Sequence, residues 1–448
     1  MKRLNNFIGL LAVFCTVQNI QAEDLASIYN KALQADPSLK TAQYRVALGS
    51  AQRGQAGGAL LPQINGSANL SLNERTPVGG DSDAYKGERY SVGLTQSVID
   101  FPKYWDWDRS KEVVKQYEAE SRDAEQNLIL DVVERYFIAL EAKDEHFLIQ
   151  QEKQSTETQL KQLKQQFKKQ IIKITDVLEI EAKLNNLEAD EIEAETLYII
   201  AKESLTELTG ERVSSLAKLK KNIAFVSLEG DLEQWIKQAQ ETNPALQAKQ
   251  KAISAASSDV AQQKSRHLPV VDAQLTYYFT NTGFQSTLAP ETETQVAALN
   301  ISVPIFSGGV TQRRADEAAQ RLEIAKQENI AKQREVVKQT RDSFLSTNAS
   351  LRRIKAAKKA LESSSKSKDA MEKGFKYGVQ TISDVLISQA REFRAKKELL
   401  QANYTYIKSK VRFMRSVGAI DEDNLLEINN WLEPSANDFP ITDDENLS

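Results

Sequence analysis

Two aspartates, Asp176 and Asp384, occupy the same position in two copies of one short motif. The copies read FKKQIIKITDVL at residues 167–178 and FKYGVQTISDVL at residues 375–386, with six of twelve positions identical at an offset of 208. The residues before each Asp predict a turn, and those after it predict a helix. A carboxylate in the first turn of a helix is stabilised by the positive end of the helix dipole by about 0.3–1 kcal/mol. The simplest chemistry of the pair is therefore to complete two helix starts.

The remaining side chains do not form a catalytic or metal-binding pattern. The two histidines, His146 and His267, are 121 positions apart in the sequence, whereas catalysis or zinc binding needs convergent partners. No Gly-rich phosphate loop, nucleophile elbow or catalytic carboxylate pair is present. The sequence therefore predicts no enzyme activity, no cofactor and no metal site.

The motif belongs to a longer internal duplication. Pro37 aligns with Pro244 at an offset of 207, close to the offset of 208 between the two motifs. A near-constant offset over a long stretch indicates a duplicated unit. We infer that residues 25–210 and 232–418 are two copies of one unit.

Each copy contains a very long stretch without helix breakers. The first has no proline between Pro102 and Pro244, and its apolar residues recur at helical spacing. A helix from about residue 103 to residue 166 would be ~96 Å long, at ~1.5 Å per residue. Such a helix is longer than the diameter of an ordinary globular domain.

Each long helix is expected to turn back and form a helical hairpin with the repeated motif at its tip. Thr175 and Ser383 are candidate N-caps of the returning helices. Gly210 and Gly418 are natural C-terminal signals for the same two helices.

Four short segments alternate between apolar and polar residues, which predicts strands. They read QINGSANLSLNE, YSVGLTQSV, VDAQLTYYF and AALNISV. Strands of about nine to eleven residues suit a tilted crossing of a bilayer, and the polar face is uncharged apart from Asp272. The alternative is two soluble hairpins packed on a helix. Because open sheet edges are not tolerated in lipid, the membrane interpretation requires further strands from other copies of the chain.

The N-terminal residues predict an export signal. Lys2 and Arg3 precede an apolar run at residues 7–17, and residues 1–22 fit a cleaved signal peptide. The single cysteine, Cys15, lies inside it and follows a Phe, so we expect no lipidation and no thiol in the mature chain. The formal net charge of −4 argues against nucleic acid binding.

Several motifs together resemble the TolC family of outer membrane efflux proteins: LPQI, LTQSVID, HLP, LNISVPIFSGG, ITDV and ISDVL. The resemblance extends from about residue 23 to residue 432. It implies a mixed α and β fold in which the duplicated chain forms a homotrimer. Each chain would give four strands to a shared twelve-stranded transmembrane β-barrel, and its helices to a long periplasmic coiled-coil barrel.

The resemblance implies a channel-tunnel in the outer membrane of a Gram-negative bacterium, with a large periplasmic part. It would passively conduct drugs, small molecules or secreted proteins from a tripartite export complex. The implied partners are a periplasmic adaptor (membrane fusion) protein, an inner membrane transporter of the ABC, RND or MFS type, and outer membrane lipid. The alternative function is that of a periplasmic coiled-coil adaptor, which should lack four membrane-length strands.

The resemblance also assigns roles at the hairpin tips. Asp384, and with it Asp176, would line the pore aperture. In the family a second Asp stands where this chain has Ile387, and a Tyr and an Arg stand at the positions of Phe375 and Gln380. Those two reach the positions of Asp176 and Thr175 on the neighbouring hairpin. With the Tyr and Arg absent here, we expect closure to depend on packing of Phe375, Ile382 and Ile387.

The expected organisation of the chain follows the duplication. The expected regions are 1–22 signal peptide, 23–61 short helix, 62–101 barrel hairpin, 102–210 helical hairpin, 211–230 equatorial linker, 231–267 second short helix, 268–306 second barrel hairpin, 307–418 second helical hairpin and 419–448 C-terminal equatorial segment with an acidic tail.

Overall fold

The computed structural model describes residues 23–220, 222–281 and 291–433. The expected signal peptide with Cys15, the tip of the second strand hairpin, and the acidic tail from residue 434 onward lie outside the described residues. No helix in the described ranges is long and apolar enough to cross a membrane.

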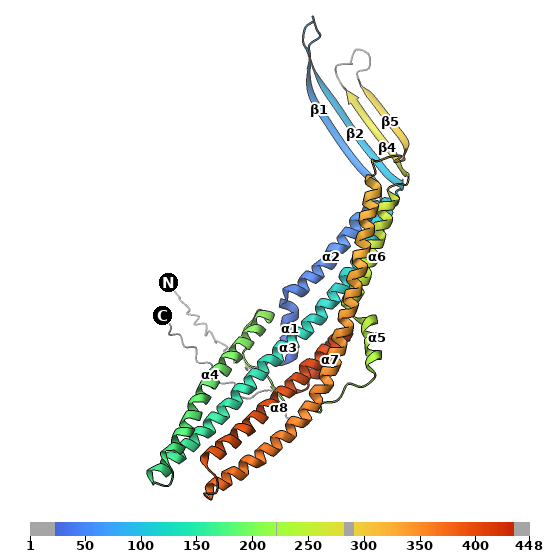
Figure 1. Ribbon diagram of the computed structural model, residues 1–448. Coiled ribbons are helices and arrows are strands. Elements are labelled where there is room, and N and C mark those ends of the chain that lie inside the picture. Colours follow the sequence, from blue (N-terminus) through green and yellow to red (C-terminus); the bar gives the residue numbers. More distant parts are fainter. Residues whose placement is uncertain (1–22, 221, 282–290, 434–448) are drawn as a thin grey trace, which may run out of the picture.

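The chain forms an elongated molecule with a narrow sheet at one end and two helical hairpins at the other (Figure 1). The elements, in chain order, are α1 Leu25–Ala35, α2 Pro37–Gly58, β1 Gln63–Arg75, β2 Asp83–Ile99, α3 Phe101–Lys168, α4 Ile174–Thr209, β3 Lys218–Leu219, α5 Leu232–Thr242, α6 Pro244–Ser265, β4 Val270–Asn281, β5 Thr292–Ser302, α7 Val310–Lys376, α8 Ile382–Val417, α9 Glu422–Asn429 and β6 Leu432–Glu433. This confirms the predicted mixed α and β fold.

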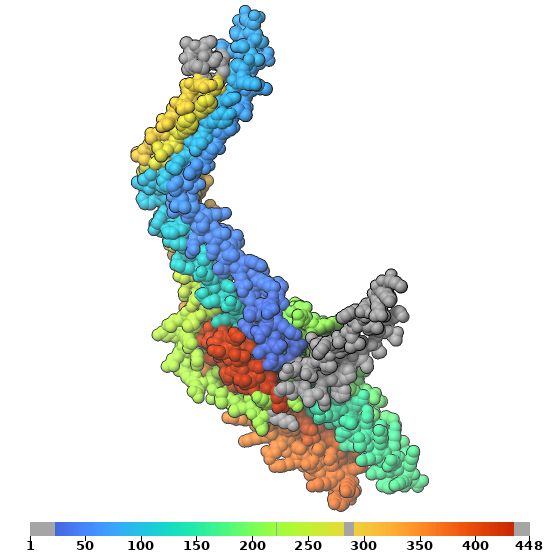
Figure 2. Space-filling view, turned by 180° about the vertical axis from the view of Figure 1, so that it is seen from behind, coloured from blue at the N-terminus to red at the C-terminus, as the bar shows by residue number. Residues whose placement is uncertain are grey.

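The two longest helices run through most of the molecule. Helix α3 has 68 residues and α7 has 67, which corresponds to about 100 Å each at ~1.5 Å per residue. Near the sheet they pack with α2 and α6, and farther away they form hairpins with α4 and α8. The space-filling view shows the first hairpin tip projecting beside the second (Figure 2).

The strands form one antiparallel sheet in the order β1-β2-β4-β5. All four predicted strands are present, and β2 is longer than expected, with 17 residues. Much of the sheet's apolar surface is exposed, including Ile64, Leu72 and Ile301. Within the described residues β1 pairs only with β2, and β5 only with β4. The sheet therefore has two unpaired edges.

Each region that we described as one short helix forms two helices. The first breaks between α1 and α2, where Asp36 accepts a hydrogen bond from Leu39 N–H at 2.6 Å and Pro37 begins α2. The second breaks in the same way at Asn243 and Pro244. A proline disfavours helical geometry at the residue before it, so each pair ends one helix and caps the next.

The main hydrophobic core lies in the middle of the molecule, where α1, α3, α4, α8 and α9 meet. Tyr136 is fully buried there, and its hydroxyl donates to Glu23 O at 3.0 Å. The expected linker and C-terminal segment join in this region through the two-stranded sheet of β3 and β6. This small sheet was not predicted from the sequence.

Candidate functional site

The two hairpin tips have the same turn. In the first, Ile171 N–H donates to Gln166 O at 3.0 Å, and in the second, Val379 N–H donates to Gly374 O at 2.9 Å. Both bonds span six residues and enclose a shorter bond, which is the Schellman arrangement that ends many helices. The repeated motif therefore encodes a repeated backbone path, and both aspartates follow it at the same distance.

One residue of each turn has left-handed backbone geometry. In the second tip it is Gly378, with φ of 73°, and in the first it is Gln170, with φ of 60°. Glycine adopts this geometry freely, whereas a residue with a β-carbon is strained by about 1–2 kcal/mol. The first tip is therefore the more strained of the two.

The returning helices begin earlier than predicted. Their N-caps are Lys173 and Thr381 rather than Thr175 and Ser383, which lie inside the first helical turn. The reason is geometric: the Schellman turn already ends at residues 171 and 379, so extended cap geometry follows two residues later. The prediction that both aspartates lie in the first turn is confirmed.

Asp384 is fixed by a reciprocal capping box. It accepts from Thr381 N–H at 3.0 Å and from the Thr381 hydroxyl at 2.7 Å, while Asp384 N–H lies 3.2 Å from that hydroxyl oxygen. These bonds from the side chain and backbone of Thr381 lower the pKa of Asp384. The carboxylate is therefore charged at neutral pH and held in one place.

Asp176 is held less firmly. It accepts a hydrogen bond from Lys173 N–H at 3.3 Å. The ammonium group of Lys173 has no acceptor atom, so it cannot return a bond as Thr381 does. Of the two carboxylates, Asp384 is the better positioned.

Below the cap residues the two tips share one hydrophobic cluster. Its buried members come from α3, α4 and α8: Leu160, Leu163, Val177, Ile180, Ile382 and Val385. Phe375 packs against this cluster from the end of α7. The two tips of one chain are therefore joined by apolar contact.

A polar bridge joins the hairpins farther from the tips. Lys183 of α4 donates to Glu152 at 2.6 Å and to Gln389 of α8 at 3.4 Å, and Gln389 donates to Glu372 of α7 at 3.0 Å. This bridge was not predicted from the sequence. A signal was available, because Gln389 continues the buried spacing of Ile382 and Val385.

The other residues assigned to the aperture do not meet in one chain. Thr175 is exposed, and Ile387 is 50% exposed outside the tip cluster. Gln380 lies over Gly374, whose added β-carbon would approach Gln380 Cγ to 2.6 Å. Of the three residues expected to support closure by packing, Phe375 and Ile382 are in or against the tip cluster and Ile387 is not.

The geometry presents two carboxylates at one end of the molecule, the better fixed of which is Asp384. Fixed negative charges at a narrow passage attract cations and repel anions, especially next to apolar walls. One chain alone does not form such a passage, which requires several tips to converge.

Comparisons with known proteins give a consistent result. The model of the family described as "Outer membrane efflux protein" matches residues 28–211 and 235–419, one match for each copy of the duplication. Outer membrane protein TolC of Vibrio cholerae is 30% identical over 439 residues, covering 97% of this chain and 99% of the relative. Alkaline protease secretion protein AprF of Pseudomonas aeruginosa is 26% identical, covering 95% of this chain and 90% of the relative.

A solved structure supports the fold. The crystal structure of the Campylobacter jejuni CmeC outer membrane channel is similar to this chain, with a TM-score of 0.79 and 16% identity. The similarity covers 92% of this chain and 90% of that one.

Proposed function

The chain belongs to the outer membrane efflux protein family and is a Gram-negative outer membrane channel for efflux or secretion, and from that premise we propose how it is built and gated. Three copies close a ring. Their twelve strands form a barrel through the outer membrane, and their helices form a periplasmic tunnel that narrows at the hairpin tips. None of the relatives favours the adaptor interpretation.

The unpaired sheet edges are the observation that carries this proposal. Strands β1 and β5 each leave one row of backbone groups without a partner among the described residues. Exposed apolar side chains on the sheet, such as Leu70 and Leu299, suit contact with lipid. Unpaired backbone groups in lipid each carry a penalty of several kcal/mol, so β5 of one copy must pair with β1 of the next.

The tips form the aperture. Three copies of Asp384 face the passage as a ring, and Asp176 forms a second, less rigid ring. Thr175, Phe375, Gln380 and Ile387 contribute contacts between neighbouring tips. The capping box of Asp384 supports this role, because a fixed carboxylate keeps its charge and position as substrates pass.

The channel receives its substrates from partners in the cell envelope. A relative whose name describes protease secretion and a family described by efflux support a complex with a periplasmic adaptor and an inner membrane transporter. The channel itself conducts passively and has no catalytic role. The structure of CmeC is likewise described as a channel.

The test is single-channel recording in planar bilayers with Asp384→Asn. Asparagine keeps an oxygen that can accept from Thr381 N–H, so the change removes charge while preserving the cap. We expect lower cation preference and weaker block by multivalent cations. Asp272→Asn is the matched control, because Asp272 lies on β4 and accepts a hydrogen bond from Ser97 at 2.9 Å. Unchanged selectivity in Asp384→Asn together with altered selectivity in Asp272→Asn would place the constriction in the barrel instead.

A further inference from the structure

The duplication makes one junction inside the chain a template for a junction between chains. Inside the chain, α3 of the first copy packs against α8 of the second. At an offset of 208, α3 corresponds to α7 and α8 corresponds to α4. If copies repeat the same arrangement head to tail, α7 of one chain meets α4 of the next. This inference rests on the proposed ring.

Apolar residues on these two faces fit the template. Phe137 of α3 is 0% exposed, and Leu345, which corresponds to it on α7, is 56% exposed. Ile407 of α8 is also 0% exposed, and its counterpart Ile199 on α4 is 50% exposed. The faces of α3 and α8 that are buried at the internal junction therefore correspond to exposed faces on α7 and α4.

The internal junction has a definite charge polarity. Its acids lie on α3 and its bases on α8: Glu141 pairs with Lys408 at 2.8 Å, and Glu145 pairs with Lys397. A groove at this junction is lined by residues including Asp144 and Gln151 of α3 and Lys396 and Asn403 of α8.

The corresponding exposed faces of α7 and α4 have the opposite charge polarity. On α7, Arg352, Arg353, Lys355 and Lys359 take the places of Asp144, Glu145, Phe147 and Gln151. On α4, Glu188 and Glu195 take the places of Lys396 and Asn403. All six side chains are exposed, and none has an ion-pair partner in the described parts of the chain.

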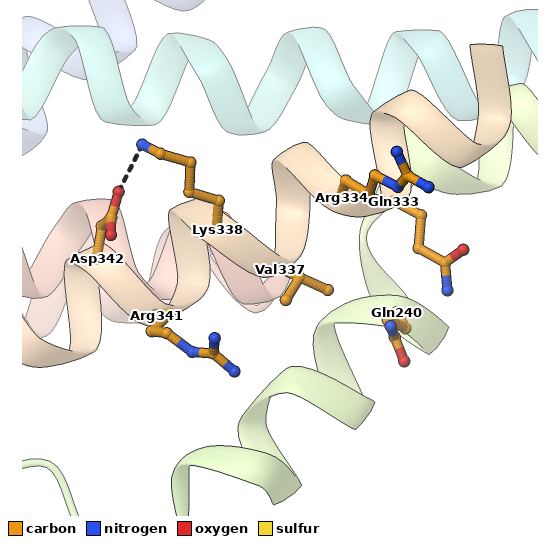
Figure 3. Close-up of a pocket in the computed structure, with 7 residues that line it drawn as sticks. All are labelled: Gln240, Gln333, Arg334, Val337, Lys338, Arg341 and Asp342. Atoms are coloured by element: carbon orange, nitrogen blue, oxygen red, sulfur yellow. Dashed lines mark hydrogen bonds and ion pairs between the residues drawn. The ribbon is translucent and has the colours of Figure 1, made fainter. Parts of the chain in front are cut away.

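The basic face extends toward α5. Arg334, Lys338 and Arg341 continue the same three- and four-residue spacing along α7, in a pocket whose far side is formed by Gln240 of α5 (Figure 3). Lys338 is paired with Asp342 at 2.7 Å and Arg341 with Glu233 at 3.4 Å. Two of these three bases are thus already paired, whereas Arg352, Lys355 and Lys359, nearer the hairpin tips, have no ion-pair partner among the described residues.

We propose that Arg352, Lys355 and Lys359 of one chain bind Glu188 and Glu195 of the next copy, forming a seam with reversed charge polarity. The reversed polarity determines which helices pair within one chain and which pair between neighbouring chains. The basic face of α8 is attracted to the acidic α3 of its own chain and repelled by the basic outer face of α7 from another chain, so the two kinds of junction cannot be exchanged. Specificity here comes from repulsion as much as from attraction.

The test is charge reversal on each side of the seam in the full-length protein. We expect Arg352→Glu with Lys355→Glu, and separately Glu188→Lys with Glu195→Lys, to lower the temperature of trimer dissociation by several degrees. Each pair places like charges together at all three seams. All four changes combined should restore most of the lost dissociation temperature, because opposite charges then face each other again. Native mass spectrometry after heating steps in detergent measures the trimer fraction.

Lys358→Glu is the matched control. Lys358 is an exposed base of α7 whose counterpart, Gln150, contributes a hydrogen bond to Glu191 of its own hairpin, so it should face α8 of its own chain. Its reversal should leave trimer dissociation almost unchanged.

Salt provides a second measurement, the first part of which needs only the unaltered protein. At 1 M NaCl the screening length falls to about 3 Å, so the trimer should dissociate at a lower temperature than at low salt. This shift should be smaller in either one-sided variant than in the unaltered protein. Equal salt shifts, or a combined variant no better than the one-sided ones, overturn the seam while leaving the trimer intact. Absence of any trimer in the unaltered protein instead overturns the proposed ring.

Discussion

The glycines that end α4 and α8 should respond very differently to the same substitution. Gly210 and Gly418 are counterparts in the duplication, and both have left-handed geometry, with φ of 70° and 78°. A β-carbon on Gly210 would meet only Ala35 Cβ at 3.8 Å. A β-carbon on Gly418 would lie 2.8 Å from Asn243 Cα and 2.9 Å from Thr242 O, which are backbone atoms at the break between α5 and α6.

The expected difference can be estimated from these contacts. Alanine in left-handed geometry costs about 1–2 kcal/mol in both variants. In Gly418→Ala the α5–α6 break must also move away. That movement strains the bonds from Thr242 Oγ1 to Val417 O (2.7 Å) and from Asn243 Nδ2 to Ser416 O (3.0 Å). At about 0.5–1.5 kcal/mol for each bond, we expect a total loss of about 2–5 kcal/mol for Gly418→Ala.

The assay combines thermal unfolding with hydrogen exchange. Gly418→Ala should lower the unfolding midpoint more than Gly210→Ala does. It should also speed amide exchange in α5 and the start of α6, while Gly210→Ala leaves that segment unchanged. Equal losses in the two variants, with no added exchange in α5, would refute the argument that close backbone approach requires a glycine at position 418.

Two further predictions concern the first tip and the core. Gln170→Gly should relieve left-handed strain of about 1–2 kcal/mol, from which about 0.5–1 kcal/mol is subtracted because glycine adds freedom to the unfolded chain. Amide exchange at the first tip should therefore become slower, whereas Gly378→Gln should make exchange at the second tip faster. The opposite pattern would contradict the assigned backbone strain. Burial raises the pKa of Asp144, so its contribution to stability is fully present below the unfolded value of about 3.9 and is lost as pH rises through the folded pKa. Asp144→Asn, which keeps an acceptor for the Tyr404 hydroxyl, should therefore raise the unfolding midpoint at neutral pH but not below about pH 3.9; an equal gain at every pH would exclude the charge as the cause.

Much of the fold could be predicted from local patterns. The missing prolines and the helical spacing of apolar residues predicted α3, and strict alternation predicted β4, because each pattern reflects one repeated backbone geometry. The breaks before Pro37 and Pro244 had a clear local signal as well, namely a capping residue followed by proline.

Other features depend on distant contacts. Strands β3 and β6 have two residues each and pair across more than two hundred positions, so no local periodicity marks them. The N-caps at Lys173 and Thr381 depend on where the preceding turn ends, which spacing alone does not fix. The assignment of Asp384 to the aperture came from resemblance and stays a prediction, although its capping box follows directly from the geometry.

The contact between α1 and α9 constrains the order of folding. Asn429 accepts from Ala26 N–H at 3.1 Å and donates to Asp24 at 3.1 Å, across more than four hundred positions. Contacts between such distant positions form late and slow the search for the native state. The main hydrophobic core therefore cannot be completed until residue 429 has been synthesised and has reached α1. A chain that lacks the segment around residue 429 cannot make these contacts, so the core where α1 meets α9 stays incomplete until the C-terminal part of the chain is present.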